Sequence, residues 1–373
     1  SLSPVLWRKL PGAKSAGRVQ SVALRLICER EVEIESFDPQ EYWKIKANLE
    51  VVDNNIEASL THYNGEKVDK FSFKNEEDAK KVTESFKGQN FKFTDITKKP
   101  ASRNPDAPFS TSTLQQTASS IFGFGASRTM QIAQRLFQGV EIDGETTGLI
   151  TYMRTDSTDL SKEAIHSYRD FIQKNFNSSY LPEEIRSFKS KKAKNAQEAH
   201  EGIRPTDILR KPEEMKKYLD EDGFKLYNLI WKRSLASQMS AASFERTAIS
   251  ISSENETIKL RANGSIQTFD GFLKIYSEFN KKPETIESED NEDDEDLPSI
   301  TLNDSIDNVK PASSQHYTLP PPRYSEATLV KKLEELGIGR PSTYASIISV
   351  LKMRNYVEVE KNRFVPEDRA ILI

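Results

Sequence analysis

The chain has 373 residues, a formal net charge of −4 and one cysteine, Cys28. That length predicts two or three domains with ordinary hydrophobic cores, and the cysteine count excludes both a disulfide framework and a zinc site with several cysteines. No stretch approaches the run of apolar residues that a membrane-spanning helix needs. The N-terminus lacks a signal-peptide pattern, so we expect a cytoplasmic protein.

Charge is unevenly distributed along the chain. Residues 284–296 hold nine acids and no bases, which leaves the remaining residues at +5. Residues 1–30 hold six lysines and arginines against one glutamate. A basic segment of this kind points to a polyanionic partner, although basic helix faces are common. The acidic run is expected to be a solvated loop without a metal role, because no apolar strand frames it.

Apolar periodicity predicts alternating helical and strand-rich regions. Residues 18–35 carry a helical apolar stripe, whereas residues 42–98 alternate with the period of half-buried strands. Helical spacing returns over residues 112–240, with Ser161 as one N-cap and the longest helix over residues 216–239. Strand alternation resumes over residues 247–262. The simplest account is a helical domain inserted into a strand-rich domain, which is itself inserted between two helical flanks.

The last 50 residues have the layout of a winged-helix element. Ser325 begins an amphipathic helix that ends near Gly337, and the sequence GIGRPS then turns the chain. Ser342 is expected to cap a second helix that runs through Leu351. The sequence NYVEVEKNRFV follows and is typical of a hairpin. A helix, turn, helix and wing in this order are typical of winged-helix nucleic-acid binders.

The densest cluster of reactive side chains is LITYMRTDST at residues 149–158. If residues 150–154 are extended, Tyr152 and Arg154 point to the same face. A guanidinium beside a phenol suits attack on a phosphate, because the cation favours the phenolate and neutralises charge that builds up on phosphoryl oxygens. The spacing alone favours a structural alternative, in which a half-buried strand tyrosine lies next to a solvated arginine.

A second cluster is QEAHEGIRP at residues 197–205. Here His200 could move protons or hydrogen-bond a phosphate, and Arg204 could donate to one. The cluster is not a zinc motif, because a second histidine at helical spacing is missing. Its structural alternative is an exposed helix start with local ion pairs.

Two further segments, SAGRVQ at residues 15–20 and GRPSTY at residues 339–344, combine glycine with polar side chains. Glycine permits close approach of a backbone, and free N–H groups at a helix start attract phosphate. Simple helix capping explains the second segment equally well. The candidate nucleic-acid contacts in and next to these segments are Ser15, Arg18, Gln20, Arg25, Arg340, Ser342 and Thr343.

Five segments in chain order carry a family resemblance. They are SAGRVQSVALRLICERE, PFSTSTLQQTAS, LITYMRTDST, QEAHEGIRP and PPRYSEATLVKKLEELGIGRPSTYASIISVL. In sequence and order they resemble the motifs of type IA DNA topoisomerases, and of the bacterial topoisomerase I branch most closely. The resemblance spans nearly the whole chain, and TYMRTDST is its most specific motif.

The resemblance implies an α+β multidomain fold, a toroidal core of four domains around a hole that admits DNA. A helical gate domain is inserted in a strand-rich arch, which is flanked by parts of the fourth domain. Residues 1–40 match the single-strand groove of the fourth domain, and residues 311–373 match its winged-helix-like part. The arch corresponds to residues 41–111 and 241–310, and the latter segment contains the acidic loop. Residues 112–240 correspond to the gate domain.

The resemblance also implies a mechanism. Tyr152 attacks a backbone phosphate of single-stranded DNA, which leaves a 5′-phosphotyrosine and a free 3′-hydroxyl. Another strand passes through the break before the hydroxyl reverses the linkage, so negative supercoils relax without ATP. Arg154 stabilises the transition state, and His200 hydrogen-bonds a phosphate close to the scissile one. The other matched residues are implied DNA contacts: Ser15, Arg18, Gln20, Arg25, Arg204, Arg340, Ser342 and Thr343.

Parts of the family pattern are not recognisable in these residues. We find neither the toprim domain, whose acidic side chains hold Mg²⁺, nor the C-terminal zinc ribbons, so no metal ligand is assigned in the chain. We therefore expect a monomeric fragment that binds single-stranded and negatively supercoiled DNA at the nucleoid but does not cleave efficiently alone.

Three alternatives stay open on the sequence. A topoisomerase III-like type IA enzyme, or the topoisomerase half of a reverse gyrase, shares the same core, although we see no inserted basic loop. A non-catalytic winged-helix nucleic-acid-binding module would leave Tyr152 with a structural role. A tyrosine recombinase places its nucleophile near the C-terminus after an Arg/Lys/His/Arg set, whereas Tyr152 lies in mid-chain.

Overall fold

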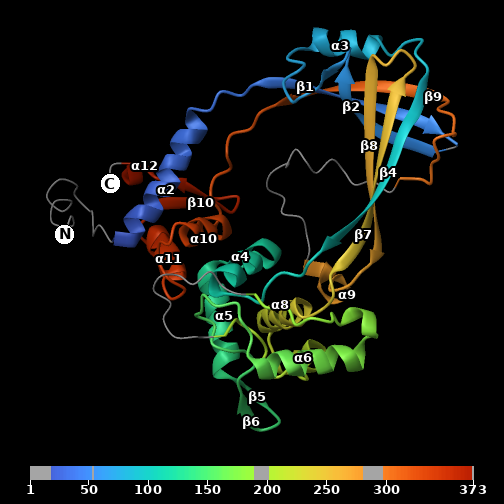
Figure 1. Ribbon diagram of the computed structural model, residues 1–373. Coiled ribbons are helices and arrows are strands. Elements are labelled where there is room, and N and C mark those ends of the chain that lie inside the picture. The colour runs from blue at the N-terminus through green and yellow to red at the C-terminus, as the bar shows by residue number, and fades with distance from the viewer. Residues whose placement is uncertain (1–17, 53, 189–200, 280–296, 372–373) are drawn as a thin grey trace.

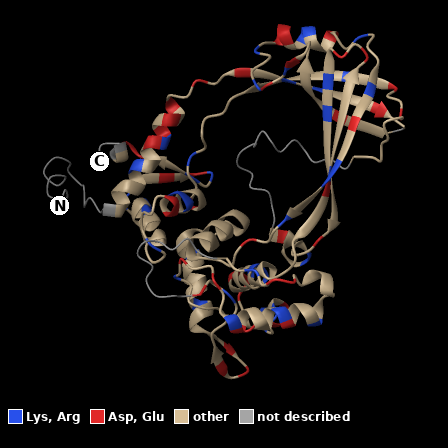
Figure 2. Ribbon diagram, viewed as in Figure 1, with Lys and Arg blue, Asp and Glu red and all other residues tan. Residues whose placement is uncertain are grey.

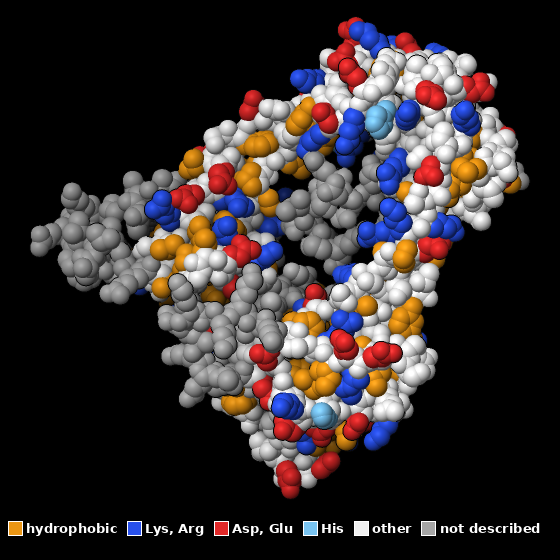
Figure 3. Space-filling view, in the orientation of Figure 1, with side chains coloured by type: hydrophobic (Ala, Val, Ile, Leu, Met, Phe, Trp, Pro, Cys, Tyr) orange, Lys and Arg blue, Asp and Glu red, His pale blue; other side chains and the backbone are white. Residues whose placement is uncertain are grey.

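A computed structural model describes residues 18–52, 54–188, 201–279 and 297–371. Its elements form three units arranged as a ring (Figure 1). We call them the sheet unit, the helical unit and the C-terminal unit. The helix predicted at the start of the chain is α2, Arg18–Glu35, and it belongs to the C-terminal unit. Figure 3 shows an opening in this face of the ring, with lysine and arginine side chains where the sheet unit borders it.

The sheet unit is an antiparallel sheet with the strand order β4-β7-β8-β2-β1-β9, and β3 also pairs with β2. The alternating residues predicted as strands point into one core, which includes Ile45, Leu49, Ile249 and Leu260. The strands are β1, Glu41–Val51; β2, Asn54–Tyr63; β3, Glu66–Lys67; β4, Phe91–Arg103; β7, Ala242–Ser253; β8, Ile258–Phe269; and β9, Asn308–Tyr317.

One helix interrupts the region predicted to be strands throughout. This helix, α3, spans Glu76–Glu84 and follows Asn75, whose side chain accepts the Asp78 amide as an N-cap. Ala79 and Val82 of α3 are buried in the sheet core. The prediction was wrong here because the helix is short and only these two apolar residues mark its buried face.

The helical unit packs around one large core. Its predicted helices are present, with α6 capped by Ser161 as expected. The helix predicted over residues 216–239 is shorter, because a 3₁₀ turn at Lys216–Tyr218 precedes it and α8 has 17 residues. It is therefore not the longest helix that the structure describes, since α2 has 18 residues. The elements are α4, Thr111–Phe122; α5, Ala126–Gln138; β5, Val140–Ile142; β6, Glu145–Thr147; α6, Lys162–Asn175; α7, Pro212–Met215; α8, Glu221–Ser237; and α9, Leu273–Tyr276. Further 3₁₀ turns lie at Ser178–Tyr180 and Ser277–Phe279.

The C-terminal unit contains the predicted helix, turn, helix and hairpin, packed against α2. Ser325 caps the first helix through a capping box with Thr328. The second helix begins at Tyr344, and Thr343 rather than Ser342 is its N-cap, without a side-chain bond. The prediction of a Ser342 cap was therefore wrong. These elements are α10, Glu326–Glu335; α11, Tyr344–Met353; β10, Val357–Glu360; β11, Arg363–Pro366; and α12, Asp368–Ile371.

Candidate active site

Tyr152 lies in the loop between β6 and α6, with 38% of its surface exposed. The ring of Phe137 meets the Tyr152 ring edge-on, with the centroids 5.5 Å apart. The strand expected over residues 150–154 does not form. Only Ile150 makes a β-bridge, to Pro205, and the chain then bends at Met153. At this bend Met153 is buried in the core of the helical unit, whereas Tyr152 remains at the surface.

Hydrogen bonds hold the backbone just before Tyr152. The Thr151 amide donates to the Arg204 carbonyl at 2.9 Å. In return the Arg204 amide donates to the Thr151 hydroxyl at 3.0 Å, and that hydroxyl donates to the Gly202 carbonyl at 2.9 Å. A residue next to the exposed tyrosine is thereby tied to a segment about 50 positions further along the chain.

Thr111, the first residue of α4, holds the backbone after Tyr152. Its fully buried hydroxyl donates to the Met153 carbonyl at 2.6 Å and accepts the Thr155 amide at 2.8 Å. The Thr111 amide also donates to the Thr155 carbonyl at 2.9 Å. Anchors on both sides fix where the exposed tyrosine lies, so its phenol is presented without a large search over loop conformations.

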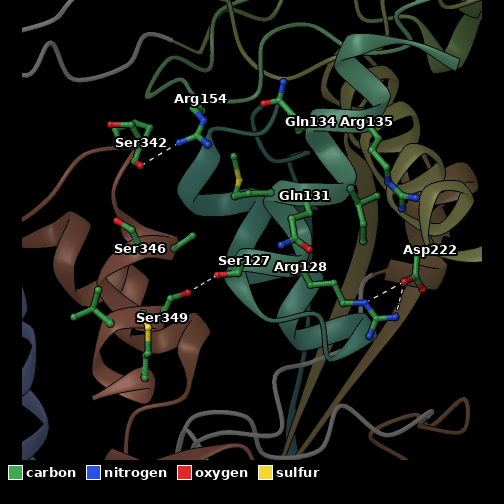
Figure 4. Close-up of a pocket in the computed structure, with 16 residues that line it drawn as sticks. Ser127, Arg128, Gln131, Gln134, Arg135, Arg154, Asp222, Ser342, Ser346 and Ser349 are labelled. Carbon is green, nitrogen blue, oxygen red and sulfur yellow. Dashed lines mark hydrogen bonds and ion pairs between the residues drawn. The ribbon is translucent and has the colours of Figure 1, made fainter. Parts of the chain in front are cut away.

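Arg154 extends from the same loop toward the C-terminal unit. Its guanidinium donates to the Ser342 carbonyl at 3.1 Å. Both residues lie along a groove of about 930 Å³ between α5 and α11, as Figure 4 shows. The structure thus brings together two segments, residues 149–158 and 339–344, that the sequence pointed to separately.

Arg340 and Thr343 form a tight turn before α11. The Thr343 hydroxyl accepts the Arg340 amide at 2.8 Å and donates to the Arg340 carbonyl at 3.1 Å. These bonds engage the hydroxyl in the turn, which explains why it does not cap the helix. The Arg340 side chain is exposed, whereas Tyr344 is buried. Burial raises the pKa of Tyr344 to about 12.

Arg204 lies inward, with only 15% of its side chain exposed. Its guanidinium forms a two-pronged ion pair with Glu201 and donates to the Pro205 carbonyl at 2.9 Å. Burial alone would raise the pKa of Glu201, but Arg204 and the hydrogen bonds from Ser161 together outweigh it, so the pKa is lowered. The helix start considered for this cluster is absent among its described residues, because Ile203 instead forms a β-bridge with Phe109. Arg204 as a DNA contact stays a prediction.

The fully buried Tyr168 interacts electrostatically with this ion pair and provides a test of the buried site. Its hydroxyl is 2.9 Å from that of Ser234, and burial raises its pKa to about 12 despite the opposing effects of Ser234 and Arg204. The contribution of Tyr168 to stability is fully present below pH 10 and falls as pH rises toward 12, because in that range the Tyr168 hydroxyl ionises in the unfolded chain but not in the folded one. The rise of about two units in the pKa of Tyr168 corresponds to about 2.7 kcal/mol in the free energy of unfolding.

Between pH 10 and pH 12 the unaltered protein should lose this amount of stability because of Tyr168. We expect Tyr168→Phe to lack this loss, because phenylalanine has no hydroxyl to ionise. Urea unfolding of the two proteins at several pH values between about 8 and about 12 measures it. Tyr317→Phe is the control, because Tyr317 is half exposed on β9. An unchanged slope in Tyr168→Phe would contradict the assignment.

For several of the predicted site residues, the structure describes no contact with the Tyr152 loop. His200 and Ser15 lie outside the described residues, and so does the side chain of Arg18. Gln20 is half-buried on α2, and the exposed Arg25 pairs with Glu29 at 2.6 Å. Figure 2 shows acidic residues interspersed with basic ones along α2. The basic character of the segment is therefore partly neutralised within its own helix.

Two positioning residues, Thr111 and Thr151, were missed by sequence reasoning. Each lies inside a motif that we singled out, PFSTSTLQQTAS or LITYMRTDST, but neither was assigned a role. Their partners lie about 40 to 50 residues away in the chain. Only a cluster of threonines next to Tyr152 and at a helix start hinted at such a role.

The described residues offer no metal centre and no membrane span. Among residues 18–52, 54–188, 201–279 and 297–371, no group of three acidic, histidine or cysteine side chains could hold a metal ion. They therefore do not fit a Mg²⁺ site. None of the helices in that part of the chain has the length and apolar character needed to cross a membrane.

Comparisons with known proteins agree with this geometry. A family model described as DNA topoisomerase matches residues 1–373. DNA topoisomerase 1 of Rickettsia felis is 53% identical over the whole chain, which covers 47% of that protein. DNA topoisomerase 1 of Zymomonas mobilis is 46% identical, and the whole chain covers 30% of it. The chain thus spans about half the length or less of these relatives.

A solved structure provides the same result for the fold. Full-length topoisomerase I from Thermotoga maritima matches with a TM-score of 0.81 and 36% identity, over 98% of this chain and 56% of that one. The ring of sheet, helical and C-terminal units is therefore a type IA topoisomerase fold. Together with the family match over its entire length, this places the chain in the DNA topoisomerase family.

Proposed function

We propose that this chain is the strand-cleaving core of a type IA DNA topoisomerase I, with Tyr152 as its nucleophile. The observation that carries the proposal is the exposed phenol on a loop anchored on both sides by buried hydrogen bonds. The Tyr152 oxygen forms a bond to a backbone phosphorus as the bond to the 3′-oxygen breaks. The strand then carries a 5′-phosphotyrosine and a free 3′-hydroxyl, whose attack restores the original bond.

Arg154 is the cation that meets the phosphate in this proposal. Its present partner is a neutral carbonyl, that of Ser342. A phosphate oxygen is a stronger acceptor for a guanidinium than a carbonyl is, so DNA can draw Arg154 from this bond. Arg340, exposed in the next turn, and His200 would contact neighbouring phosphates. Ser15, Arg18, Gln20, Arg25, Arg204, Ser342 and Thr343 complete the proposed set of DNA contacts.

The ring gives the broken strand a route for passage. We propose that residues 112–240 lift away as a gate, that residues 41–111 and 241–310 form the arch, and that residues 1–40 and 311–373 form the fourth domain. Storing the cleaved bond as a phosphotyrosine makes ATP unnecessary. Mg²⁺ is the proposed cofactor, and acidic side chains of a toprim domain would hold it, because the described residues of this chain include no group that could bind a metal ion.

Binding of the chain to DNA tests the proposal directly. We expect a single-stranded oligonucleotide to bind more tightly than its duplex in fluorescence anisotropy. With three or more phosphate contacts, affinity should fall at least about tenfold between about 50 and about 200 mM salt. Equal or tighter binding of duplex would instead support a winged-helix module, for which α10, α11 and the β10–β11 hairpin are the observed basis.

We further propose single-stranded and negatively supercoiled DNA as the partners, a monomer as the working form, and the cytoplasmic nucleoid as the location. A topoisomerase III-like enzyme is the alternative within the family. Relaxation assays with a full-length protein that contains this chain distinguish the two, because the proposed activity removes negative supercoils from an intact plasmid.

A further inference from the structure

The helix α10 joins the C-terminal unit to the helical unit through both of its ends. At its first residue, the Glu326 side chain is only 11% exposed and accepts the Ala126 amide at 2.6 Å. Ala126 is the first residue of α5, and Gly125 before it provides no side-chain cap. Glu326 therefore caps α5 from 200 positions away in the chain. Its other partner is Lys352 of α11.

A second carboxylate lies near the opposite end of α10. Glu334 accepts the hydroxyl of Ser112, which is in the first turn of α4. The Gln116 amide nitrogen donates to the same Ser112 oxygen at 2.8 Å. Two of the three acids of α10 thus bind in the first turns of helices of the helical unit, Glu326 at a backbone amide and Glu334 at a side-chain hydroxyl, where the helix dipole favours negative charge.

The contact between the units is polar in other places as well. The Ser127 hydroxyl of α5 lies 2.7 Å from that of Ser349 on α11, as Figure 4 shows. Arg154 bonds across the same boundary to Ser342. Polar groups of this kind can exchange their partners for water when two surfaces separate, and the apolar part of the contact includes the small side chains of Ala126 and Ala345.

We propose that Glu326 and Glu334 are a two-point latch that holds the helical unit closed against the C-terminal unit. The role of the latch in strand passage rests on the proposed function, because the helical unit is the proposed gate. Glu326 accepts the first amide of α5 and Glu334 accepts the Ser112 hydroxyl of α4, and both charge-assisted bonds break when the gate opens. The latch is supplied by one rigid helix, so the two bonds form together.

Hydrogen exchange of the chain without DNA tests the latch. Glu326→Gln and Glu334→Gln keep the side-chain shapes but remove the charges. We expect exchange on both sides of the contact to accelerate about tenfold in Glu326→Gln, and by a smaller factor in Glu334→Gln because Glu334 is exposed to water. Glu335→Gln is the matched control on α10. Its carboxylate is half exposed and faces Lys332 of its own helix at 3.8 Å, so we expect no change.

A substitution on the other side of the contact tests Glu326 without altering a charge. A Cβ on Gly125 would lie 3.1 Å from one carboxylate oxygen of Glu326 and 3.3 Å from the other. The φ of Gly125 is −64°, which alanine adopts freely. Gly125→Ala should therefore displace the carboxylate and accelerate exchange several-fold at both α5 and α10.

A disulfide separates opening of the gate from fraying of one helix. The double substitution Ser127→Cys and Ser349→Cys, in a Cys28→Ser background, places two thiols that can be oxidised to join the units covalently. Oxidation should restore slow exchange across the contact in Glu326→Gln. Fast exchange confined to the first turn of α5, and not restored by oxidation, would overturn the latch, as would exchange equal to that of Glu335→Gln.

These readouts involve neither DNA nor cleavage, so they stand apart from the chemistry at Tyr152. If the variants did not accelerate hydrogen exchange but the full-length protein still formed the adduct, only the latch proposal would be contradicted. If the variants accelerated hydrogen exchange as expected but no adduct formed at Tyr152, only the proposed function would be contradicted.

Discussion

Tyr152→Phe in a full-length protein that contains this chain is expected to abolish the covalent adduct with single-stranded DNA. Phenylalanine keeps the ring that meets Phe137 but lacks the oxygen that would bond to phosphorus. We expect adduct formation to fall at least about 10³-fold, while binding of the oligonucleotide changes little. Denaturing gel electrophoresis of labelled DNA measures the adduct, and anisotropy measures the binding.

Tyr317→Phe is the control for this substitution. Tyr317 is also exposed, but it lies on β9 in the sheet unit, away from the anchored loop. The Tyr317→Phe protein should form adducts at the same rate as the unaltered protein. Adducts that persist in Tyr152→Phe would assign the nucleophile to another residue.

Thr111→Val is expected to have the largest effect on stability among the residues around the loop. Valine has nearly the same shape, but it leaves the Met153 carbonyl and the Thr155 amide without the partner they have now. Each buried backbone group left unpaired costs about 1–3 kcal/mol, so we expect a loss of about 2–5 kcal/mol. Urea unfolding followed by circular dichroism measures this change.

The matched control is Thr94→Val on the exposed part of β4. The Thr94 hydroxyl also donates to a backbone carbonyl, that of Ser250 at 3.1 Å, but water can replace it there. We expect a change within about 0.5 kcal/mol. A Thr111→Val protein as stable as this control would show that the buried hydroxyl does not anchor the loop.

The elements of the fold with strong periodicity could be predicted from the sequence. Alternating residues such as Ile249 and Ile251 identified β7, because strands with one buried face repeat every two residues. Capping residues such as Ser161 and Ser325 marked helix starts, because their hydroxyls bond first-turn amides. The short α3 escaped because its apolar residues are too few to establish a helical period.

The candidate site was only partly predictable, because its geometry depends on contacts between distant segments. The motif containing Tyr152 and Arg154 was found from residue types alone. The sequence did not indicate that a bend at Met153 would replace a strand, since that bend depends on Thr111 some 40 residues earlier. Nor did it indicate that Arg204 would be paired with Glu201 beneath the surface, because burial is set by the surrounding fold.

The pairing of β1 with β9 has a consequence for how the protein is made. Glu41 pairs with Tyr317, so the two strands close a loop that contains all of the helical unit. Such long-range pairing slows folding, because loop closure costs entropy before the contacts form. During synthesis β1 must wait for β9, while the helical unit can fold as soon as its own residues emerge. We therefore expect the inserted unit to be built before the sheet that carries it is complete.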